Sequence, residues 1–256
     1  MAKIFLTLLI SFGSCLSADD LMEAIKSEYR NPENILRDEF RNPYETLTFF
    51  GIEPSMKVVE LSPGGGWYTE ILANYLNNSG ELIAAHFDEN SNNNYLKKIR
   101  KNFEKKMVSN SIYEGVKIVD LTSELTEPRS ADAILTFRNL HNWLGPTMDS
   151  IFANSFKALK SGGIFGVVEH RAKTGTSIEK MKKSGYVTEE HAIEIAQKHG
   201  FVLISKSEIN SNPKDLKNYE KGVWTLPPSL RLKEKNKGKY LAIGESDRMT
   251  LLFKKP

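Results

Sequence analysis

Short apolar runs alternate with amphipathic segments along most of the chain beyond residue 57. The runs have the length of buried strands, and the segments between them repeat apolar positions every three or four residues, as helices packed on one face do. Strands are predicted at 58–61, 82–87, 116–119, 131–137, 164–168, 201–207 and 249–253, and helices at 68–76, 95–107, 151–159 and 189–199. This alternation predicts an α/β fold with a mostly parallel sheet and helices on both faces.

Two segments depart from the alternation. Residues 18–50 have helical spacing that is broken at Asn31-Pro32 and Asn42-Pro43, where we expect each proline to begin a new helix. Residues 208–244 are polar and rich in lysine, and we interpret them as a long insertion, functional or mobile, ahead of the last strand. The sequence therefore predicts an N-terminal helical segment at 18–50 and an α/β domain at 51–256.

The first residues have the pattern of an export signal. Lys3 precedes an apolar run at 4–10, and the small residues Cys15 and Ser17 follow. This pattern predicts a signal peptide at 1–17 and a periplasmic or secreted protein, with no stable membrane span after signal removal. A lipoprotein signal acylated at Cys15 and an unprocessed apolar helix are the alternatives. Cys15 is the only cysteine, so the mature chain would form no disulfide and offer no thiol nucleophile.

The composition is that of an ordinary soluble globular protein. Of the 256 residues, 40% are hydrophobic and 26% are charged, which argues against disorder. The net charge is only +3 and both signs are interspersed, so the sequence gives no reason to expect nucleic-acid binding. The chain has neither an HExxH motif nor Cys and His at zinc-ligand spacing, and we expect no metal site.

A glycine-rich turn, ELSPGGGWYT at 60–69, joins the first predicted strand to the first predicted helix. Such a turn lets the backbone approach a ligand closely, and the helix N-terminus adds N–H groups. A phosphate loop would need a Lys and a Ser or Thr after the last glycine, and a dinucleotide fingerprint would need a small residue where Thr69 stands. What remains is Glu60 followed four and six residues later by Gly64 and Gly66.

This arrangement resembles the first motif of class I S-adenosylmethionine-dependent methyltransferases. The likeness covers about residues 30–256, and over this range the pattern of motifs is similar to that of a group of exported predicted methyltransferases of unassigned substrate. Its other motifs are Arg37-Asp38, Arg41, PYETL at 43–47, FFGI at 49–52, LKSGG at 159–163, Glu169-His170, GYV at 185–187 and GESDRM at 244–249. The resemblance implies a Rossmann-like sheet of seven strands with the last antiparallel, S-adenosylmethionine as cofactor, and a small-molecule methyl acceptor.

The resemblance also implies cofactor contacts. We expect them from Glu60, Pro63, Gly64, Gly66, Tyr68, Asp88 and Asp120. Carboxylates suit ribose hydroxyls, an aromatic face suits a sulfonium, and Asp120 follows the third strand where the resemblance places the adenine contact. Glu60 capping the next helix and Tyr68 packing on the N-terminal helices are the alternatives. Two residues depart from the family pattern: Ser62 replaces the first glycine of the loop, and His86 replaces an acidic residue for which Asp88 would substitute.

Two polar clusters are predicted at the carboxyl ends of strands, where ligands bind in open α/β sheets. Asn139 and His141 follow the fourth strand, and Glu169 and His170 follow the fifth. Histidine can act as a base near neutral pH, so we predict catalytic roles for His141, His170 and Glu169, with Asn139 positioning substrate or cofactor. A structural role for either histidine is the alternative.

Three functions are compatible with these patterns. The first is methyl transfer from S-adenosylmethionine to a small molecule by an exported enzyme. The second is an exported ligand-binding or sensing module that keeps the fold without transfer activity, in which case Ser62 and His86 mark a repurposed pocket. The third, a nicotinamide-dependent oxidoreductase, is disfavoured by the glycine spacing.

Overall fold

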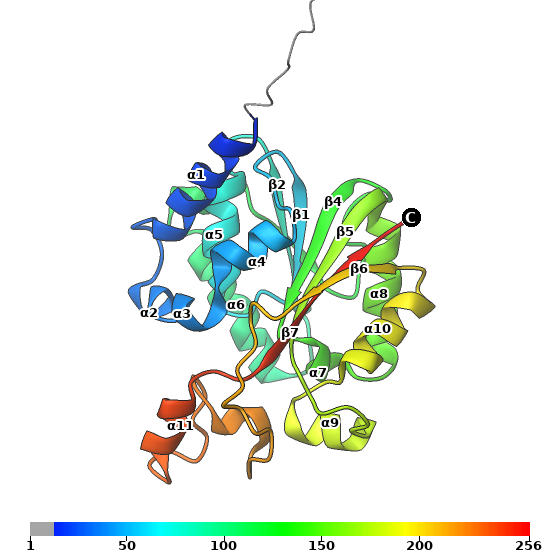
Figure 1. The fold of residues 1–256 in the computed structure, drawn as a ribbon. Helices are drawn as coiled ribbons and strands as arrows, with labels where there is room; N and C mark the ends of the chain where they lie inside the picture. Colours follow the sequence, from blue (N-terminus) through cyan, green and yellow to red (C-terminus); the bar gives the residue numbers. More distant parts are fainter. Residues whose placement is uncertain (1–12) are drawn as a thin grey trace, which may run out of the picture.

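The structure is a computed structural model that describes residues 13–256 (Figure 1). Most of the predicted signal peptide at 1–17 therefore lies outside the described residues. The first helix, α1 (Gly13–Lys26), begins before the predicted cleavage point at Ser17 and continues beyond it. Within residues 13–256, no helix has the length and apolar character needed to cross a membrane.

The core of the fold is a single seven-stranded sheet in the order β3-β2-β1-β4-β5-β7-β6. Its strands are β1 (Lys57–Leu61), β2 (Glu81–His86), β3 (Lys117–Asp120), β4 (Ala131–Phe137), β5 (Leu159–His170), β6 (Val202–Ser207) and β7 (Arg248–Lys254). All neighbouring strands are parallel except β7, which runs antiparallel to both β5 and β6. The predicted Rossmann-like fold is confirmed, including the antiparallel last strand.

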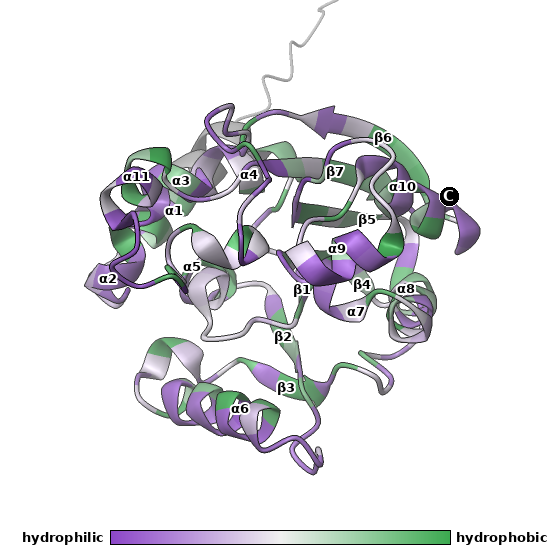
Figure 2. Cartoon of the chain, turned by 90° about the horizontal axis from the view of Figure 1, so that it is seen from below, coloured by the Kyte–Doolittle hydropathy of each residue, from purple (hydrophilic) through white to green (hydrophobic). Residues whose placement is uncertain are grey.

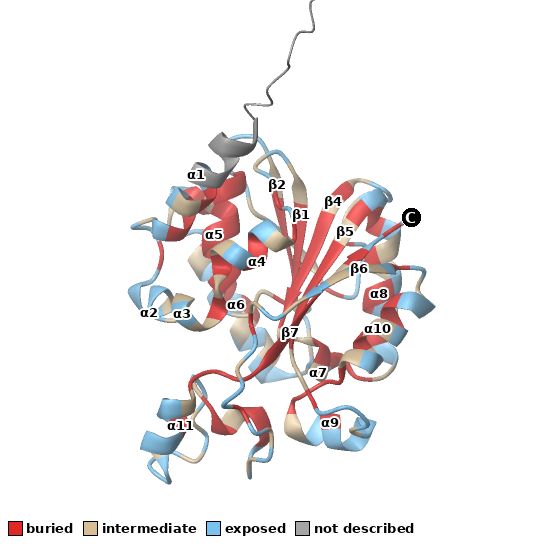
Figure 3. Ribbon diagram, in the orientation of Figure 1, coloured by how far each residue is buried: buried red, intermediate tan, exposed pale blue. Residues whose placement is uncertain are grey.

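Helices cover both faces of the sheet, and its five inner strands are mostly buried, whereas β3 and β6 at the two ends are partly exposed (Figures 1 and 3). The helices next to the sheet and its loops are α4 (Pro43–Phe49), α5 (Trp67–Leu76), α6 (Asn94–Met107), α7 (Leu140–Trp143), α8 (Pro146–Ala158), α9 (Ile178–Ser184) and α10 (Glu189–Lys198), with a short 3₁₀ turn, η1 (Ser111–Tyr113). Side chains alternate between the faces of a strand, so Val58 belongs to a core cluster with α1, α4 and α5 on one side, while Val59 belongs to a cluster with α8 and α10 on the other.

The N-terminal helices pack firmly onto the domain. Helices α2 (Pro32–Ile35) and α4 each have a proline in the first turn, as predicted, and α3 (Asp38–Arg41) lies between them. The Trp67 ring at the start of α5 lies near two guanidinium groups, with Arg30 Cζ 5.1 Å and Arg41 Cζ 4.6 Å from its centroid. Arg30 also makes a bidentate ion pair with Asp38. These contacts hold α3 at a fixed distance from the glycine turn.

The insertion at 208–244 is an ordered segment that crosses the carboxyl edge of the parallel strands (Figure 1). It contains the 3₁₀ turn η2 (Gly222–Thr225) and α11 (Lys237–Ile243). The buried carboxylate of Asp215 accepts hydrogen bonds from the Tyr186 hydroxyl and the Asp247 N–H, which fixes the segment to the core at two points. Figure 2 looks at this edge and shows that α9, beside the insertion, is mainly hydrophilic.

Candidate active site

The turn after β1 takes its shape from three residues in the left-handed region of the backbone. Ser62, Gly64 and Gly66 have φ angles of 49°, 60° and 79°. Glycine adopts such angles without strain, whereas the Cβ of a serine makes them costly. A Cβ added at Gly64 would meet no atom within 4 Å, so the main chain faces open space there. The sequence thus places exposed backbone at the carboxyl end of β1.

Asn139 joins this turn to the end of β4. Its Nδ2 atom lies 3.1 Å from the carbonyl oxygens of both Leu61 and Ser62. From β1 the chain adds β2 and β3 on one side of the sheet and then returns to add β4 on the other side. Open α/β sheets bind ligands at the carboxyl ends of the two strands where this change of side occurs. The Asn139 side chain therefore holds the carboxyl ends of β1 and β4 together.

His86 is directed at the glycine turn. Its Nδ1 atom accepts a hydrogen bond from the Phe87 N–H at 2.8 Å, so Nε2 must carry the proton that it donates to the Gly64 carbonyl at 3.1 Å. Burial lowers the pKa of His86 and keeps the ring neutral. Both ring nitrogens of His86 are hydrogen-bonded within the protein, so the side chain stabilises the glycine turn. It has no free ring nitrogen for the ligand contact that an acidic residue would make at this position.

A cavity of about 600 Å³ opens beside the turn, and we call it the large cavity. Polar groups of Gly64, Asp88, Asn139 and His141 line it, together with apolar side chains of α6, of α7 and of the segments that follow β2 and β3. Two buried polar atoms on its wall, Ser62 Oγ and Trp143 Nε1, have no hydrogen-bond partner among residues 13–256. Buried polar atoms are normally paired, so these two are available to a ligand.

The predicted cofactor residues divide into two groups. Gly64 and Asp88 line the large cavity, whereas the others do not; these are Glu60, Pro63, Gly66, Tyr68 and Asp120. Tyr68 is buried in the core and stacks on Phe137 at 3.5 Å. One oxygen of Asp120 accepts a hydrogen bond from Arg100 on α6 at 3.1 Å. A Cβ at Gly66 would meet Phe103, which shows that this glycine packs against α6.

Glu60 lies beneath the turn and is only 2% exposed. Burial raises its pKa to about 7, although a hydrogen bond from Thr69 Oγ1 at 2.6 Å and the charges of Lys106 and Arg138 oppose this. The carboxyl group therefore binds a proton in the folded state at pH values where the unfolded chain has lost it. Its position indicates support of the turn from inside the fold.

His141, which lines the large cavity, forms a hydrogen-bonded pair with Glu169. The Glu169 carboxylate, which is fully buried, accepts hydrogen bonds from the N–H groups of Leu140 and His170. It also lies 3.0 Å from His141 Nδ1, which must donate because the carboxylate is an acceptor. The lone pair on His141 Nε2 is then free to take a proton. The structure brings these two predicted catalytic residues together in the arrangement of a base and its orienting carboxylate.

His170 lies beside this pair, with its ring centroid 5.3 Å from that of His141. Its Nδ1 atom contacts the Ser246 hydroxyl, and burial together with the charge of His141 holds its pKa well below the ordinary value. One ligand atom each from His141, Glu169 and His170 could reach a common metal ion, since these atoms lie within 4.8 Å of one another. Both Glu169 oxygens already accept hydrogen bonds from main-chain N–H groups.

A second cavity, of about 250 Å³, adjoins the first, and we call it the arginine cavity. Arg37, just before α3, Arg41, the last residue of α3, and Arg138, just after β4, line it around the carboxylate of Glu245. His141 and Trp224 line both cavities, so the two spaces meet at these side chains. We predicted no role for these arginines from the sequence. Arg37 and Arg41 do stand among the motifs that resemble the methyltransferases, and this could have marked them as candidates.

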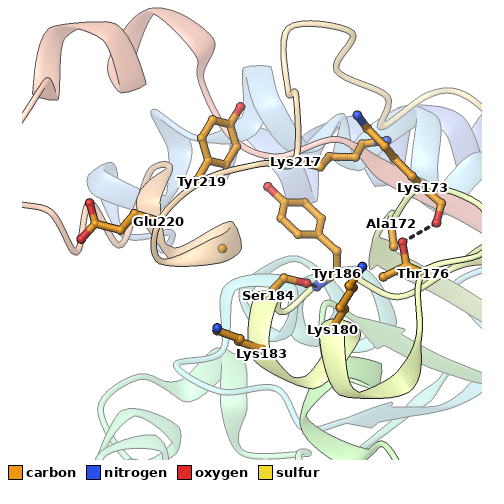
Figure 4. Close-up of a pocket in the computed structure, with 11 residues that line it drawn as sticks. Ala172, Lys173, Thr176, Lys180, Lys183, Ser184, Tyr186, Lys217, Tyr219 and Glu220 are labelled. Carbon is orange, nitrogen blue, oxygen red and sulfur yellow. Dashed lines mark hydrogen bonds between the residues drawn. The ribbon is translucent and has the colours of Figure 1, made fainter.

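The insertion covers both cavities. Trp224, in η2, lies with its ring 5.9 Å from that of His141, and the Arg231 guanidinium lies 4.5 Å from the Trp224 ring. Sequence analysis predicted a functional or mobile loop here, and the structure places its residues on the walls of the candidate site. A further basic pocket, shown in Figure 4, lies on the other side of the insertion and is lined by lysines such as Lys180 and Lys183.

The fold is shared with proteins of known structure. No protein-family model and no curated protein sequence matches the chain. A geranyl diphosphate methyltransferase in complex with S-adenosylmethionine is 10% identical, with a TM-score of 0.59 over 92% of this chain and 95% of that one. A methyltransferase from Aquifex aeolicus that depends on S-adenosylmethionine is 16% identical, with a TM-score of 0.56 over 75% and 93% of the two chains.

A third similar structure has another activity. The [4+2]-cyclase SpnF is 12% identical to this chain, with a TM-score of 0.61 over 94% of this chain and 93% of the cyclase. Identities this low show the fold alone. The chain therefore has the fold of S-adenosylmethionine-dependent methyltransferases, and that fold also serves a cyclase.

The raised pKa of Glu60 predicts a pH-dependent effect on stability. The unfolded chain loses the proton near pH 4.5 and the folded chain near pH 7, so the free energy of unfolding falls as the pH rises between these values. Glu60→Gln should be more stable than the wild type at pH 8, by up to about 3 kcal/mol, and nearly equal at pH 4. Urea unfolding at both pH values measures this difference.

Glu114→Gln, at an exposed position, is the matched control and should change stability by less than about 0.5 kcal/mol at either pH. A Glu60→Gln variant that is less stable than the wild type at pH 8 would contradict the interpretation, because it would show that an ionised Glu60 stabilises the turn.

Proposed function

We propose that the protein binds S-adenosylmethionine in the large cavity and transfers its methyl group to a small molecule. The observation that carries this proposal is the exposed glycine turn at the carboxyl end of β1, next to a cavity with two unpaired buried polar atoms. The methyltransferase fold and the paired His141 and Glu169 at the cavity mouth support it.

The residues of the large cavity fit this cofactor. One carboxylate oxygen of Asp88 accepts a hydrogen bond from the Asn90 N–H, which leaves the other free for ribose hydroxyls. Leu96, Ile99 and Leu121 provide an apolar surface for a purine ring, and Ser62 Oγ and Trp143 Nε1 can pair with its polar groups. The backbone at Gly64 can approach the ligand without a side chain in the way.

The contribution of the protein to the reaction is position and proton transfer. When bound, S-adenosylmethionine supplies an electrophilic methyl group, whose bond to sulfur breaks as the acceptor forms its bond to carbon, with the electron pair left on sulfur. His141 lines both cavities, and because its Nδ1 is bonded to Glu169, its Nε2 can take the proton that the acceptor atom loses. Glu169 orients the ring and stabilises the positive charge that it gains. Trp224 covers the junction and limits access of water.

A binding or sensing module without transfer activity is the second candidate. One observation favours it: both ring nitrogens of His86 are engaged within the protein, so His86 offers no contact to a cofactor. The cyclase SpnF shows that the fold can serve a protein named for another reaction. The two candidates differ in turnover of S-adenosylmethionine, which is directly measurable.

Binding of S-adenosylhomocysteine, measured by calorimetry and by melting temperature, tests the cofactor assignment. At 100 times its Kd, the ligand should stabilise the fold by about 2.7 kcal/mol. Asp88→Ala should raise the Kd about tenfold or more, because a hydrogen bond to a charged group contributes about 1.5–3 kcal/mol. Glu89→Ala removes an exposed neighbour that does not line the cavity and should leave the Kd unchanged. A well-folded wild type that binds neither S-adenosylhomocysteine nor S-adenosylmethionine would contradict the assignment.

Replacement of His141 tests the proton-transfer role. With an acceptor found by screening for S-adenosylhomocysteine release, His141→Gln should lower kcat by about 10²- to 10⁴-fold. His191→Gln, on α10 and outside both cavities, is the control and should keep wild-type kcat. Wild-type kcat in His141→Gln would show that the acceptor needs no base. Absence of turnover in a wild type that binds the cofactor would favour the binding module.

We also propose export, on the N-terminal pattern alone. Lys3, the apolar run at 4–10 and the small residues Cys15 and Ser17 support cleavage before Ala18. After expression of the full chain in a bacterial host, mass spectrometry of the periplasmic fraction should give a protein that begins at Ala18. A lipid-modified Cys15 would establish the lipoprotein alternative, and an intact chain confined to the cytoplasm would contradict export.

A further inference from the structure

We propose that the arginine cavity binds an oxyanion group of the methyl acceptor, such as a carboxylate or a phosphate, with Arg41 and Arg138 as its principal ligands. This inference rests on the proposed function, because it assigns the second cavity to the molecule that receives the methyl group. The acceptor is then an anion, whereas the sequence alone predicted only a small molecule.

The first observation is an uncompensated charge. Four guanidinium groups, those of Arg37, Arg41, Arg138 and Arg248, surround the single carboxylate of Glu245. The Glu245 carboxylate lies 2.7 Å from Arg37, 3.3 Å from Arg41 and 3.2 Å from Arg248. One carboxylate cannot neutralise four cations, so the cavity carries an excess of positive charge next to low-dielectric walls.

The second observation is that two of these groups keep free donors. Arg41 is only 4% exposed, and its Nη1 atom has no hydrogen-bond partner among the described residues. The Arg138 side chain donates no hydrogen bond to any residue in 13–256, although it lines the cavity and its backbone is held at a φ of 64°. The unpaired donor of Arg41 is buried, which is costly, whereas Arg138 is half-buried on the cavity wall. A bound oxyanion would supply hydrogen-bond acceptors to both groups.

The electrostatic consequences are visible in the neighbouring groups. Burial, reinforced by the other arginines, lowers the pKa of Arg138 to about 10 and that of Arg41 well below its usual range. For Glu245, burial favours the neutral acid, but the four arginines outweigh it and lower the pKa to about 2. Each shift is in the direction that an excess of positive charge produces.

The position of the cavity suits one end of an acceptor. Its volume of about 250 Å³ can hold an oxyanion group with a short connecting chain. His141 lies on the wall shared with the large cavity, so an acceptor anchored on the arginines presents its other end to the His141 base. Two-point anchoring of this kind fixes orientation, which supplies much of the rate in a bimolecular transfer.

The other possible occupant is the carboxylate of S-adenosylmethionine itself. The two assignments make opposite predictions about simultaneous binding. If the arginines hold the acceptor, an anion and S-adenosylhomocysteine bind together. If they hold the amino-acid end of the cofactor, the anion and S-adenosylhomocysteine exclude each other.

The test is calorimetric titration of the full chain with inorganic phosphate and, separately, with acetate, at constant ionic strength, with and without saturating S-adenosylhomocysteine. We expect at least one of the two anions to bind in the presence of S-adenosylhomocysteine; which one binds more tightly distinguishes a phosphate from a carboxylate acceptor. Arg138→Gln should raise the Kd of that anion at least about tenfold, because one charge-assisted contact is lost, and leave S-adenosylhomocysteine binding intact. Arg37→Gln, at the more exposed rim, is the second variant if Arg138→Gln does not fold.

Lys183→Gln, in the basic pocket of Figure 4, is the matched control and should not change anion binding. Equal loss of binding in this control, no binding of either anion to the folded wild type, or mutual exclusion of the anion and S-adenosylhomocysteine would overturn the inference. Anion binding that depends on Arg138, in a protein that does not bind S-adenosylhomocysteine, would overturn the proposed function and leave the anion site standing.

Discussion

The site depends on one buried carboxylate, that of Glu245, and on the arginines that gather around it. Arg37 and Arg41 come from the N-terminal helices, Arg138 from the end of β4 and Arg248 from the start of β7, so a single charge joins segments from both ends of the chain. Removal of one partner from a buried ion pair is strongly destabilising, because the other charge stays buried without compensation. This cluster therefore couples the placement of the N-terminal helices and of the insertion to the geometry of the site.

Around the cluster, the fold separates two tasks. The glycine turn and the strand ends of β1 to β4 form the large cavity, whereas the arginines form a smaller and more polar one. His141 stands between them, oriented by Glu169, and Trp224 covers the junction. Such an arrangement allows a cofactor and an anionic acceptor to approach a common base from opposite sides, with water restricted by the insertion.

Local patterns in the sequence were enough to predict the sheet, since strand periodicity and the glycine turn are properties of short segments. The same patterns predicted that His141 and Glu169 follow two strands of the sheet, and in the structure their side chains are hydrogen-bonded. The sequence left two roles open for Tyr68, and only the structure shows that its ring stacks on Phe137 and that its hydroxyl donates to the Arg41 carbonyl on α3. The arginine cavity was equally hidden, since Arg41 and Glu245 meet only through the fold. The insertion has no apolar periodicity because polar contacts such as those of Asp215 fix it.

The most direct test of the account is a crystal structure of the protein grown with S-adenosylhomocysteine and phosphate. We expect S-adenosylhomocysteine between Gly64 and Asp88 in the large cavity, with a phosphate bound at the same time to Arg41 and Arg138. A structure with the carboxylate of S-adenosylhomocysteine on the arginines, or with the large cavity empty while phosphate is bound, would contradict it.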